Sequence, residues 1–448
     1  MQRRHFLETL GLVGAGCVCS ARDSRAAEPG QAKPSAEADS HADSAHEAFE
    51  RYERRFAEAR LRMPLRDPVR PDDRATIIQV AKQCLGIRDA WIPTIQTTSA
   101  GQIEFDGGRI ELLRSTSWPG VVGSALLYSP AEPGPGPLPL VTLCCGHGQG
   151  GKLTAGYQAM ARHLTRRGAL VLCPDNIGQG EREPMGHSRC VAPFACGLSV
   201  QGLIVMETLG WIAWARQQPN VDARRLAAIG NSGGGTLTVF LAALCPELAV
   251  LSSSGYPSTF EFIASKEKQH CHCNLLPGIV GQLEMWHLLG CFAPRPLFIF
   301  QGDGDSLIPP DLFYHTARKV RHVYRAANAE KAFQAKVLKG AHSWDAARNV
   351  ELGKFLAATL KLPKPIPRED PEERLLSAQD TCWKPWPADA LDADRLAQQL
   401  TGRSVRDGLR LWDIFPPQAL ASDARPDESF RGTTQQILAQ FEAFLAQR

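Results

Sequence analysis

The residues with the clearest chemical potential lie in a glycine-rich turn around Ser232. Residues 230–234 have the pattern Gly-x-Ser-x-Gly, between an apolar run at 225–230 and a helix-like stretch. In this strand–turn–helix setting the serine is exposed at the start of a helix, where free N–H groups favour negative charge. The tight turn leaves no room for large flanking side chains, which accounts for Gly230 and Gly234. We therefore predict that Ser232 is a nucleophile; a plain glycine turn is the alternative.

A nucleophilic serine needs a general base, and the base needs a carboxylate that orients it. His342 follows the apolar run 333–338, and it alone among the twelve histidines has the position and chain order expected of the base. Asp303 and Asp305 both lie in the loop after the run 296–301. The pattern Gly-x-x-Asp-x-x-aliphatic-Pro favours Asp305 as the acid. The alternative for either aspartate is capping of the loop.

Backbone N–H groups must hold the negative oxygen that forms when a serine attacks a carbonyl. One expected donor is the N–H of Gly233, directly after the serine. The other is the N–H of Gln149, within the glycine-rich stretch 146–151 that follows an apolar run. Such a stretch can also bind phosphate, but it lacks the ending of a nucleotide-binding loop, because Lys152 is followed by Leu153.

From about residue 102 onward, short apolar runs alternate with amphipathic stretches. Some runs, such as residues 137–145, are almost continuously apolar, which is typical of strands buried on both faces of a mainly parallel sheet. The alternation predicts an α/β protein with a doubly wound sheet of about eight strands and flanking helices, whose ligand crevice lies beyond the carboxyl ends of the strands. The expected strands are 109–115, 121–128, 139–145, 168–173, 225–230, 248–254, 296–301 and 333–338, and the expected helices are 153–167, 200–217, 234–245 and 344–360.

In this order the motifs resemble those of the α/β-hydrolase superfamily, and most of all its bacterial branch of acetyl xylan esterases, cephalosporin deacetylases and dienelactone-hydrolase-like proteins. The resemblance covers about residues 85–361. It implies the α/β-hydrolase fold and ester hydrolysis without a metal or cofactor, often of an acetylated carbohydrate. The segments that carry it are 145–152, 171–182, 230–235, 270–278 and 293–297.

The segment His270-Cys271-His272-Cys273 has residue types that bind metals. If the segment is extended, alternate residues point to opposite sides, so at most two of them can face one ion. No second cluster of suitable spacing is evident that would complete a tetrahedral site. We interpret the segment as a structural loop beside the pocket and expect no metal.

Together, the motifs predict a serine carboxylic-ester hydrolase that uses Ser232, His342 and Asp305 and acts on a carbohydrate or similar small ester. A peptidase of the prolyl-oligopeptidase type uses the same triad. The roughly 100 residues ahead of the hydrolase are too few for the β-propeller that such peptidases carry. The second alternative is a non-catalytic binding protein on the same fold, but every catalytic residue type is retained in order.

The first residues resemble a twin-arginine export signal, because Arg3 and Arg4 precede a short, mildly apolar stretch. Cleavage after Ala21 or Ala26 would fit, since each site has a small residue at the −3 position of the cleavage site. We therefore expect an exported protein, periplasmic or extracellular. The alternatives are a chance arginine pair in a cytoplasmic protein and a lipid anchor at Cys17.

The rest of the chain is expected to divide around the catalytic domain. A linker poor in apolar residues follows the signal, and two helices, near 46–61 and 73–85, precede the hydrolase. The final segment has no assigned role and ends in an expected helix near 431–447. The predicted units are 1–26 (signal), 27–45 (disordered linker), 46–101 (helical segment), 102–361 (hydrolase) and 362–448 (appendage).

The composition fits a globular protein whose partner is a small ester substrate. Hydrophobic residues make up 44% of the 448 residues, and the formal net charge of +3 gives no reason to expect nucleic acid as a partner. No apolar run approaches the roughly 18–20 residues that span a bilayer. Four of the thirteen cysteines, Cys144, Cys145, Cys173 and Cys245, lie inside apolar runs and are expected to be core residues. Disulfides are not predicted.

Overall fold

The computed structural model describes residues 73–148, 150–187, 192–265, 272–274, 276, 278–364 and 374–403. The predicted export signal, the possible anchor at Cys17, the linker and the expected helices at 46–61 and 431–447 lie outside these residues. Within them, no helix is long and apolar enough to cross a membrane.

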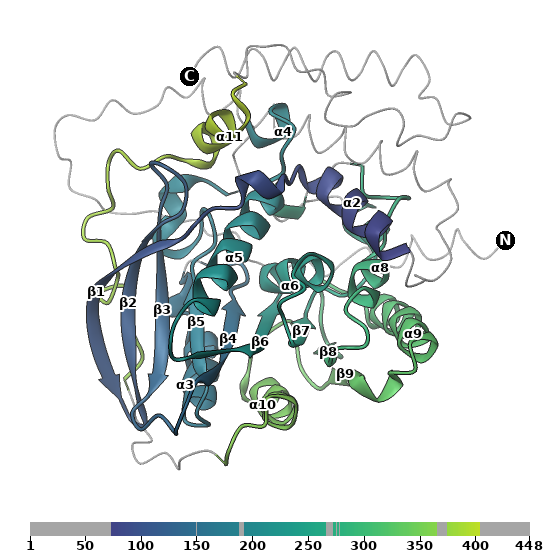
Figure 1. Ribbon diagram of the computed structural model, residues 1–448. Coiled ribbons are helices and arrows are strands. Elements are labelled where there is room, and N and C mark those ends of the chain that lie inside the picture. The colour runs from purple at the N-terminus through teal and green to yellow at the C-terminus, as the bar shows by residue number, and fades with distance from the viewer. Residues whose placement is uncertain are drawn as a thin grey trace.

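A nine-stranded sheet forms the centre of the molecule (Figure 1). Its strand order is β1-β2-β3-β5-β4-β6-β7-β8-β9, antiparallel from β1 to β5 and parallel from β5 to β9. This mostly parallel, doubly wound sheet confirms the predicted fold class. The strands are β1 Gln96–Phe105, β2 Gly108–Thr116, β3 Val122–Pro130, β4 Leu138–Cys144, β5 Leu170–Pro174, β6 Val221–Asn231, β7 Val250–Ser254, β8 Leu297–Gly302 and β9 Phe333–Leu338.

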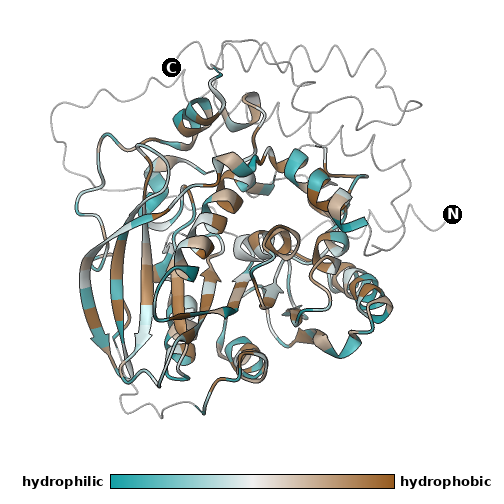
Figure 2. Cartoon of the chain, in the orientation of Figure 1, coloured by the Kyte–Doolittle hydropathy of each residue, from teal (hydrophilic) through white to brown (hydrophobic). Residues whose placement is uncertain are grey.

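The eight predicted strands correspond to β2–β9, and β1 was missed. Strand β1 is an edge strand, rich in Gln, Thr and Ser, and none of its residues is fully buried. A polar edge strand lacks the apolar run that identifies a buried one, and this polarity also protects an exposed edge from pairing with other chains. Figure 2 shows the contrast between the outer strands and the hydrophobic centre of the sheet.

Helices cover both faces of the sheet (Figure 1). Helices α2, α5, α6, α8 and α9 contribute to the hydrophobic core on one face, and α3 and α10 to the core on the other. The predicted helices are confirmed at α2, α3, α5, α6 and α10. The helices are α2 Arg74–Leu85, α3 Ala155–Thr165, α4 Ala192–Ala195, α5 Val200–Arg216, α6 Gly233–Leu244, α7 Phe260–Ser265, α8 Met285–Gly290, α9 Pro310–Ala326, α10 Ala346–Leu360 and α11 Ala393–Thr401.

Strand β6 shows how the sheet separates the two cores. Leu226 and Ala228 belong to the core on one face, whereas Ala227 and Ile229 belong to the core on the other, and all four are almost fully buried. Successive side chains of a strand point to opposite faces, so a strand covered on both sides must be apolar at every position. This explains the continuous apolar run that leads to Ser232.

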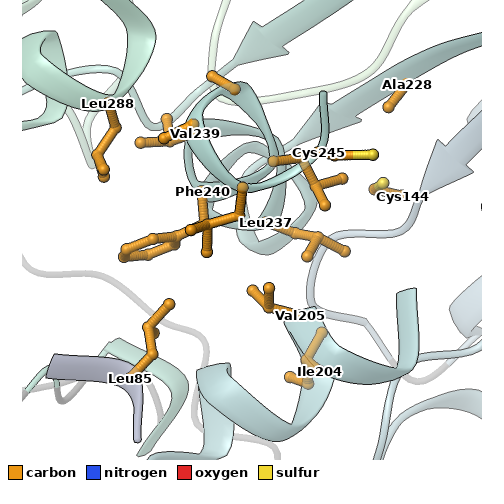
Figure 3. Packing of buried hydrophobic residues seen from close by; sticks show 14 of the residues in the cluster. Leu85, Cys144, Ile204, Val205, Ala228, Leu237, Val239, Phe240, Cys245 and Leu288 are labelled. Atoms are coloured by element: carbon orange, nitrogen blue, oxygen red, sulfur yellow. The ribbon is translucent and has the colours of Figure 1, made fainter. Parts of the chain in front are cut away.

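Helix α6, which begins directly after Ser232, is buried on all sides (Figure 3). Its side chains, including Leu237 and Phe240, pack among residues from α2, α5, α8 and the sheet, such as Leu85 and Leu288. The ring of Phe240 stacks on that of Phe260 with centroids 6.0 Å apart. A helix enclosed in this way holds the preceding turn in a fixed position.

Residues 374–403 pack against the predicted hydrolase domain. Leu376 and Cys382 belong to the core that includes α3 and α10, whereas Leu396 of α11 belongs to the opposite core. Helix α11 lies beside α4 (Figure 1), where the Asp394 carboxylate accepts a hydrogen bond from the N–H of Ala192 at 2.9 Å. This part of the predicted appendage therefore contributes to both hydrophobic cores.

We predict that Phe240→Ala lowers the free energy of unfolding by about 3–5 kcal/mol, because it leaves a cavity in the core that encloses α6. The control is Val350→Ala, at a half-exposed position on α10, with an expected change within about 0.5 kcal/mol. Urea unfolding followed by circular dichroism measures both. Equal effects of the two substitutions would contradict the role given to α6.

Candidate active site

A cavity of about 970 Å³ opens at the carboxyl edge of the parallel strands. Its walls come from the loops after β4, β5, β6, β7, β8 and β9, which is where ligands bind in open α/β sheets. The residues that line it are His147, Gly148, Gly178, Gln179, Gly180, Glu183, His187, Ser232, Gly233, Thr236, Gly255, Tyr256, Ile263, Asn274, Leu307, Ile308 and His342.

Ser232 sits on a strained turn between β6 and α6. Its φ of 57° and ψ of −120° are values that a residue with a side chain rarely adopts. The glycines on either side are required, as predicted: a Cβ on Gly230 would collide with the carbonyl oxygen of Gly234, and a Cβ on Gly234 with that of Cys144. The turn thus presents the serine at the cavity wall.

Asp305 and His342 form a hydrogen-bonded pair. His342 Nδ1 lies 2.8 Å from Asp305 Oδ2, and Asp305 Oδ1 accepts the N–H groups of Leu307 and Ile308 at 2.9 and 3.0 Å. Burial alone would raise the pKa of Asp305, but the hydrogen bond from His342, the charge of that imidazole and the two N–H groups outweigh it and lower the pKa. The carboxylate is therefore ionised at neutral pH and accepts the Nδ1 proton of the imidazole.

The other ring nitrogen of His342 is the one available for chemistry. With Nδ1 protonated, Nε2 of the neutral imidazole carries the lone pair. Nε2 is buried, and it has no hydrogen-bond partner among the described residues, Ser232 Oγ included. His342 and Ser232 nevertheless line the same cavity, and catalytic hydrogen bonds are often long before substrate binds.

Asp303, the other aspartate considered for the acid, has a different contact. Its Oδ1 accepts the N–H of Gly340 at 2.8 Å, and its own N–H donates to the carbonyl of Leu338. The side chain therefore caps the loop that carries His342. The aspartate that contacts His342 in the structure is therefore Asp305, and Asp303 contacts Gly340 instead.

The loop after β4 lies against the serine turn. A Cβ on Gly146 would be 3.1 Å from Cβ of Ser232, and a Cβ on Gly233 would be 2.6 Å from the ring of His147. The N–H of Gly233 is the first of α6, and the first N–H groups of a helix have no partner within it. Gln149, the second expected oxyanion donor, lies outside the described residues.

A buried cation, which the sequence analysis did not identify as important, holds this loop. Lys152 is fully buried, and its Nζ lies 2.6 Å from Asp175 Oδ2 and 2.5 Å from Glu181 Oε1. Burial alone would lower the pKa of Lys152, but the two carboxylates outweigh it and raise the pKa. Glu181 also accepts the N–H groups of Cys382 and Trp383. The network thus joins the loop after β4, the loop after β5 and the C-terminal segment.

A second cluster missed from the sequence combines His147 and His187, which line the cavity, with Cys273. Their potential ligand atoms lie within 4.8 Å of one another. The burial of His187 lowers its pKa, which keeps the imidazole neutral. Of the histidine–cysteine segment interpreted as a loop, Cys273 takes part in this cluster, while His270 and Cys271 lie outside the described residues. Cys273 is disulfide-bonded, which the sequence analysis did not predict.

Comparisons with solved structures support the fold. Similar structures include methylesterase BT1017 (20% identity, 84% of this chain and 76% of that one, TM-score 0.50). A candidate acetyl xylan esterase from Bacteroides fragilis (15%, 63% and 80%, 0.52) and a glucuronoyl esterase from Solibacter usitatus (13%, 64% and 92%, 0.53) are also similar. No protein-family model and no curated protein matches the sequence. The chain has the α/β-hydrolase fold that these esterases share, as the sequence resemblance implied.

We predict that Lys152→Met destabilises the protein by about 3–5 kcal/mol, because it leaves two buried carboxylates without their cation. Lys336→Met is the matched control, since its pair with Glu351 is largely exposed and is worth less than about 1 kcal/mol. Thermal unfolding of both variants measures the difference. A loss no larger than that of the control would show that the buried network does not hold the loop.

Proposed function

We propose that the protein is a serine hydrolase of carboxylic esters, with Ser232 as nucleophile, His342 as general base and Asp305 as the orienting acid. The observation that carries the proposal is the Asp305–His342 pair at 2.8 Å, on the same cavity as a serine held at φ 57°. Strained serines beside a paired histidine are the arrangement that nucleophilic catalysis requires.

The proposed reaction follows from the protonation of this pair. His342 Nε2 accepts the Ser232 hydroxyl proton while Ser232 Oγ attacks the ester carbonyl. The N–H of Gly233, and in our proposal that of Gln149, hold the oxyanion. His342 then gives its proton to the departing alcohol and leaves an acyl-enzyme. Water, deprotonated by His342, hydrolyses the acyl-enzyme and releases the acid.

The cavity favours a neutral, sugar-sized ester. Its volume of about 970 Å³ is at the upper end of the roughly 300–1,000 Å³ of small-molecule sites. Among the lining residues that the structure describes, Glu183 has a carboxylate and there is no lysine or arginine that could pair with an anionic substrate. Polar side chains such as Gln179 and Asn274 can bind hydroxyl groups. We therefore propose an acetylated carbohydrate as the substrate class and export as the location of the activity.

Methylesterase and glucuronoyl esterase are the named activities of two similar structures, so methyl uronates and glucuronoyl esters are the comparison substrates. A screen of the purified protein with these esters and with acetylated sugars tests the substrate class. Preference for an acetylated sugar in kcat/KM supports our proposal. Preference for either uronic ester would show that the substrate is a uronic ester and not an acetylated carbohydrate, and it would leave the proposed serine mechanism unchanged.

We predict that Ser232→Ala lowers kcat for a p-nitrophenyl acetate ester by a factor on the order of 10⁵–10⁶ and abolishes labelling by a fluorophosphonate. Ser99→Ala, at an exposed position of β1, is the control and should retain both. Labelling that persists in the Ser232 variant, or none in the folded wild type, would refute the assignment. Cleavage of aminoacyl-proline anilides would indicate a peptidase instead.

Asp305→Asn should lower kcat about 10⁴-fold, because the amide no longer holds the productive tautomer of His342. Asp303→Asn is the matched control: it caps Gly340 and does not contact His342, so we expect a change of less than about tenfold. Steady-state kinetics of both variants, with circular dichroism to verify folding, decides between them. A larger loss in the Asp303 variant would reverse the assignment of the acid.

A further inference from the structure

We propose that His147, His187 and Cys273, with the sulfur of Cys273 as a thiolate, bind a divalent transition metal ion of the zinc type at the wall of the cavity. The three residues come from separate segments: the loop after β4, the segment after β5 and the segment that precedes α8. Two imidazoles and a thiolate are ligands that zinc prefers. No metal was expected from the sequence because no second cluster of suitable spacing accompanies the histidine–cysteine segment, whereas His147 and His187 approach Cys273 only in the folded chain.

The distances between the ligand atoms fit a metal site. Nε2 of His147 lies 3.1 Å from Nε2 of His187 and 3.1 Å from Sγ of Cys273, and all three atoms are within 4.8 Å of one another. With bonds of about 2.0–2.1 Å to nitrogen and about 2.3 Å to sulfur, ligand atoms of a tetrahedral zinc site lie about 3.3–3.6 Å apart. The N···N separation is about 0.2 Å shorter than the lower value, which applies to two nitrogens, and the N···S separation is about 0.5 Å shorter than the upper value, so binding of the ion would move the ligand atoms slightly apart.

The hydrogen of the neutral His187 imidazole is on Nδ1, which leaves the lone pair that a metal ligand needs on Nε2. Its Nδ1 lies 2.8 Å from the carbonyl oxygen of Ile177, and because a carbonyl only accepts, Nδ1 carries the hydrogen. In the neutral imidazole Nε2 then has the lone pair, which lies 3.1 Å from His147 Nε2 and accepts an N–H of the Gln179 amide at 3.2 Å. Metal-binding histidines characteristically donate their second N–H to a backbone carbonyl or carboxylate, which fixes the ring.

The ligand atoms also take part in hydrogen bonds. His187 Nε2 accepts an N–H of the Gln179 side chain at 3.2 Å, and His147 Nε2 lies within hydrogen-bond distance of both His187 Nε2 and Cys273 Sγ. A metal ion at this position would replace these hydrogen bonds with bonds to all three ligand atoms.

The redox state of Cys273 decides whether the site is complete. Cys273 is disulfide-bonded in the structure, and the thiolate, not the disulfide, is the strong metal ligand. Two equivalents of a thiol reductant reduce the disulfide to two thiols and are themselves oxidised to one disulfide. Binding of the metal then displaces the proton of the Cys273 thiol. We therefore infer that the reduced protein binds the metal and that oxidation releases it.

The ion would affect the proposed catalytic residues by fixing the position of the loop that carries His147. His147 belongs to the loop that contributes to the oxyanion side of the site, and a Cβ on Gly233 would touch its ring. A metal that joins this loop to His187 and Cys273 would hold it against Ser232. These three residues are thus positioning residues, whatever reaction the serine performs.

The test measures metal content in the full-length, untagged protein. The wild type is reduced with dithiothreitol, loaded with Zn²⁺, desalted and analysed by mass spectrometry for metal, and Co²⁺ is loaded in parallel. We expect about one ion per chain and, with Co²⁺, a thiolate-to-metal charge-transfer absorption. Oxidation should release the ion, and renewed reduction should restore binding.

Variants locate the site independently of ester hydrolysis. His147→Ala, whose side chain is at the exposed end of the cluster, and His187→Ala should weaken Zn²⁺ binding by more than the roughly 10–100-fold that loss of an outer-shell partner costs. Cys273→Ser should lose the charge-transfer absorption. His322→Ala, on the exposed side of α9, should bind as wild type does.

No bound zinc in the reduced wild type, or equal binding in all four variants, would overturn the proposal. Because His147 is exposed, its substitution leaves the core intact even if His187→Ala fails to fold. Metal content is read without a substrate. If no metal binds, the proposed esterase activity is therefore not contradicted. If the Ser232 variant loses esterase activity, we still expect it to bind the metal as the wild type does.

Discussion

The close packing of α6 against the end of β4 is the constraint on which the site depends. The backbone of Gly234 approaches the carbonyl of Cys144 so closely that no side chain fits between them. Because β4 and β6 are neighbours in the sheet, this contact brings the turn of Ser232 beside the loop that starts at Gly146. The strained backbone at Ser232, worth on the order of 1–3 kcal/mol, is sustained by the burial of the whole of α6.

Much of the fold could be predicted because its signals are local. The buried strands β2–β9 are apolar runs, and the turn at Ser232 has glycines where the backbone leaves no room for Cβ atoms. Strand β1 was missed because an exposed edge carries polar residues. Helix α9 was missed although Phe313, Val320 and Tyr324 recur at helical spacing on its buried side. In that case the signal was present and was overlooked.

The contacts between distant segments could not be predicted. Nothing near Lys152 in the sequence indicates Asp175 and Glu181 as its partners, because they approach only when β4 and β5 pair in parallel and their carboxyl ends lie side by side. The same holds for His147, His187 and Cys273, which are spread over more than 120 residues. Asp303 and Asp305 are two residues apart, and only the backbone of their loop shows which carboxylate meets His342 and which caps Gly340.

The C-terminal segment has a consequence for how the chain acquires its structure during synthesis. Trp383 donates its indole N–H to the carbonyl of Gly123, and Gln158 exchanges hydrogen bonds with the backbone of Leu376, across 260 and 218 residues of sequence. Contacts of such separation form late, because a long loop must close before they contribute any stability. Both hydrophobic cores therefore remain incomplete on the ribosome until residues 374–403 have emerged. The nascent chain is then a species with exposed apolar surface, of the kind that chaperones bind.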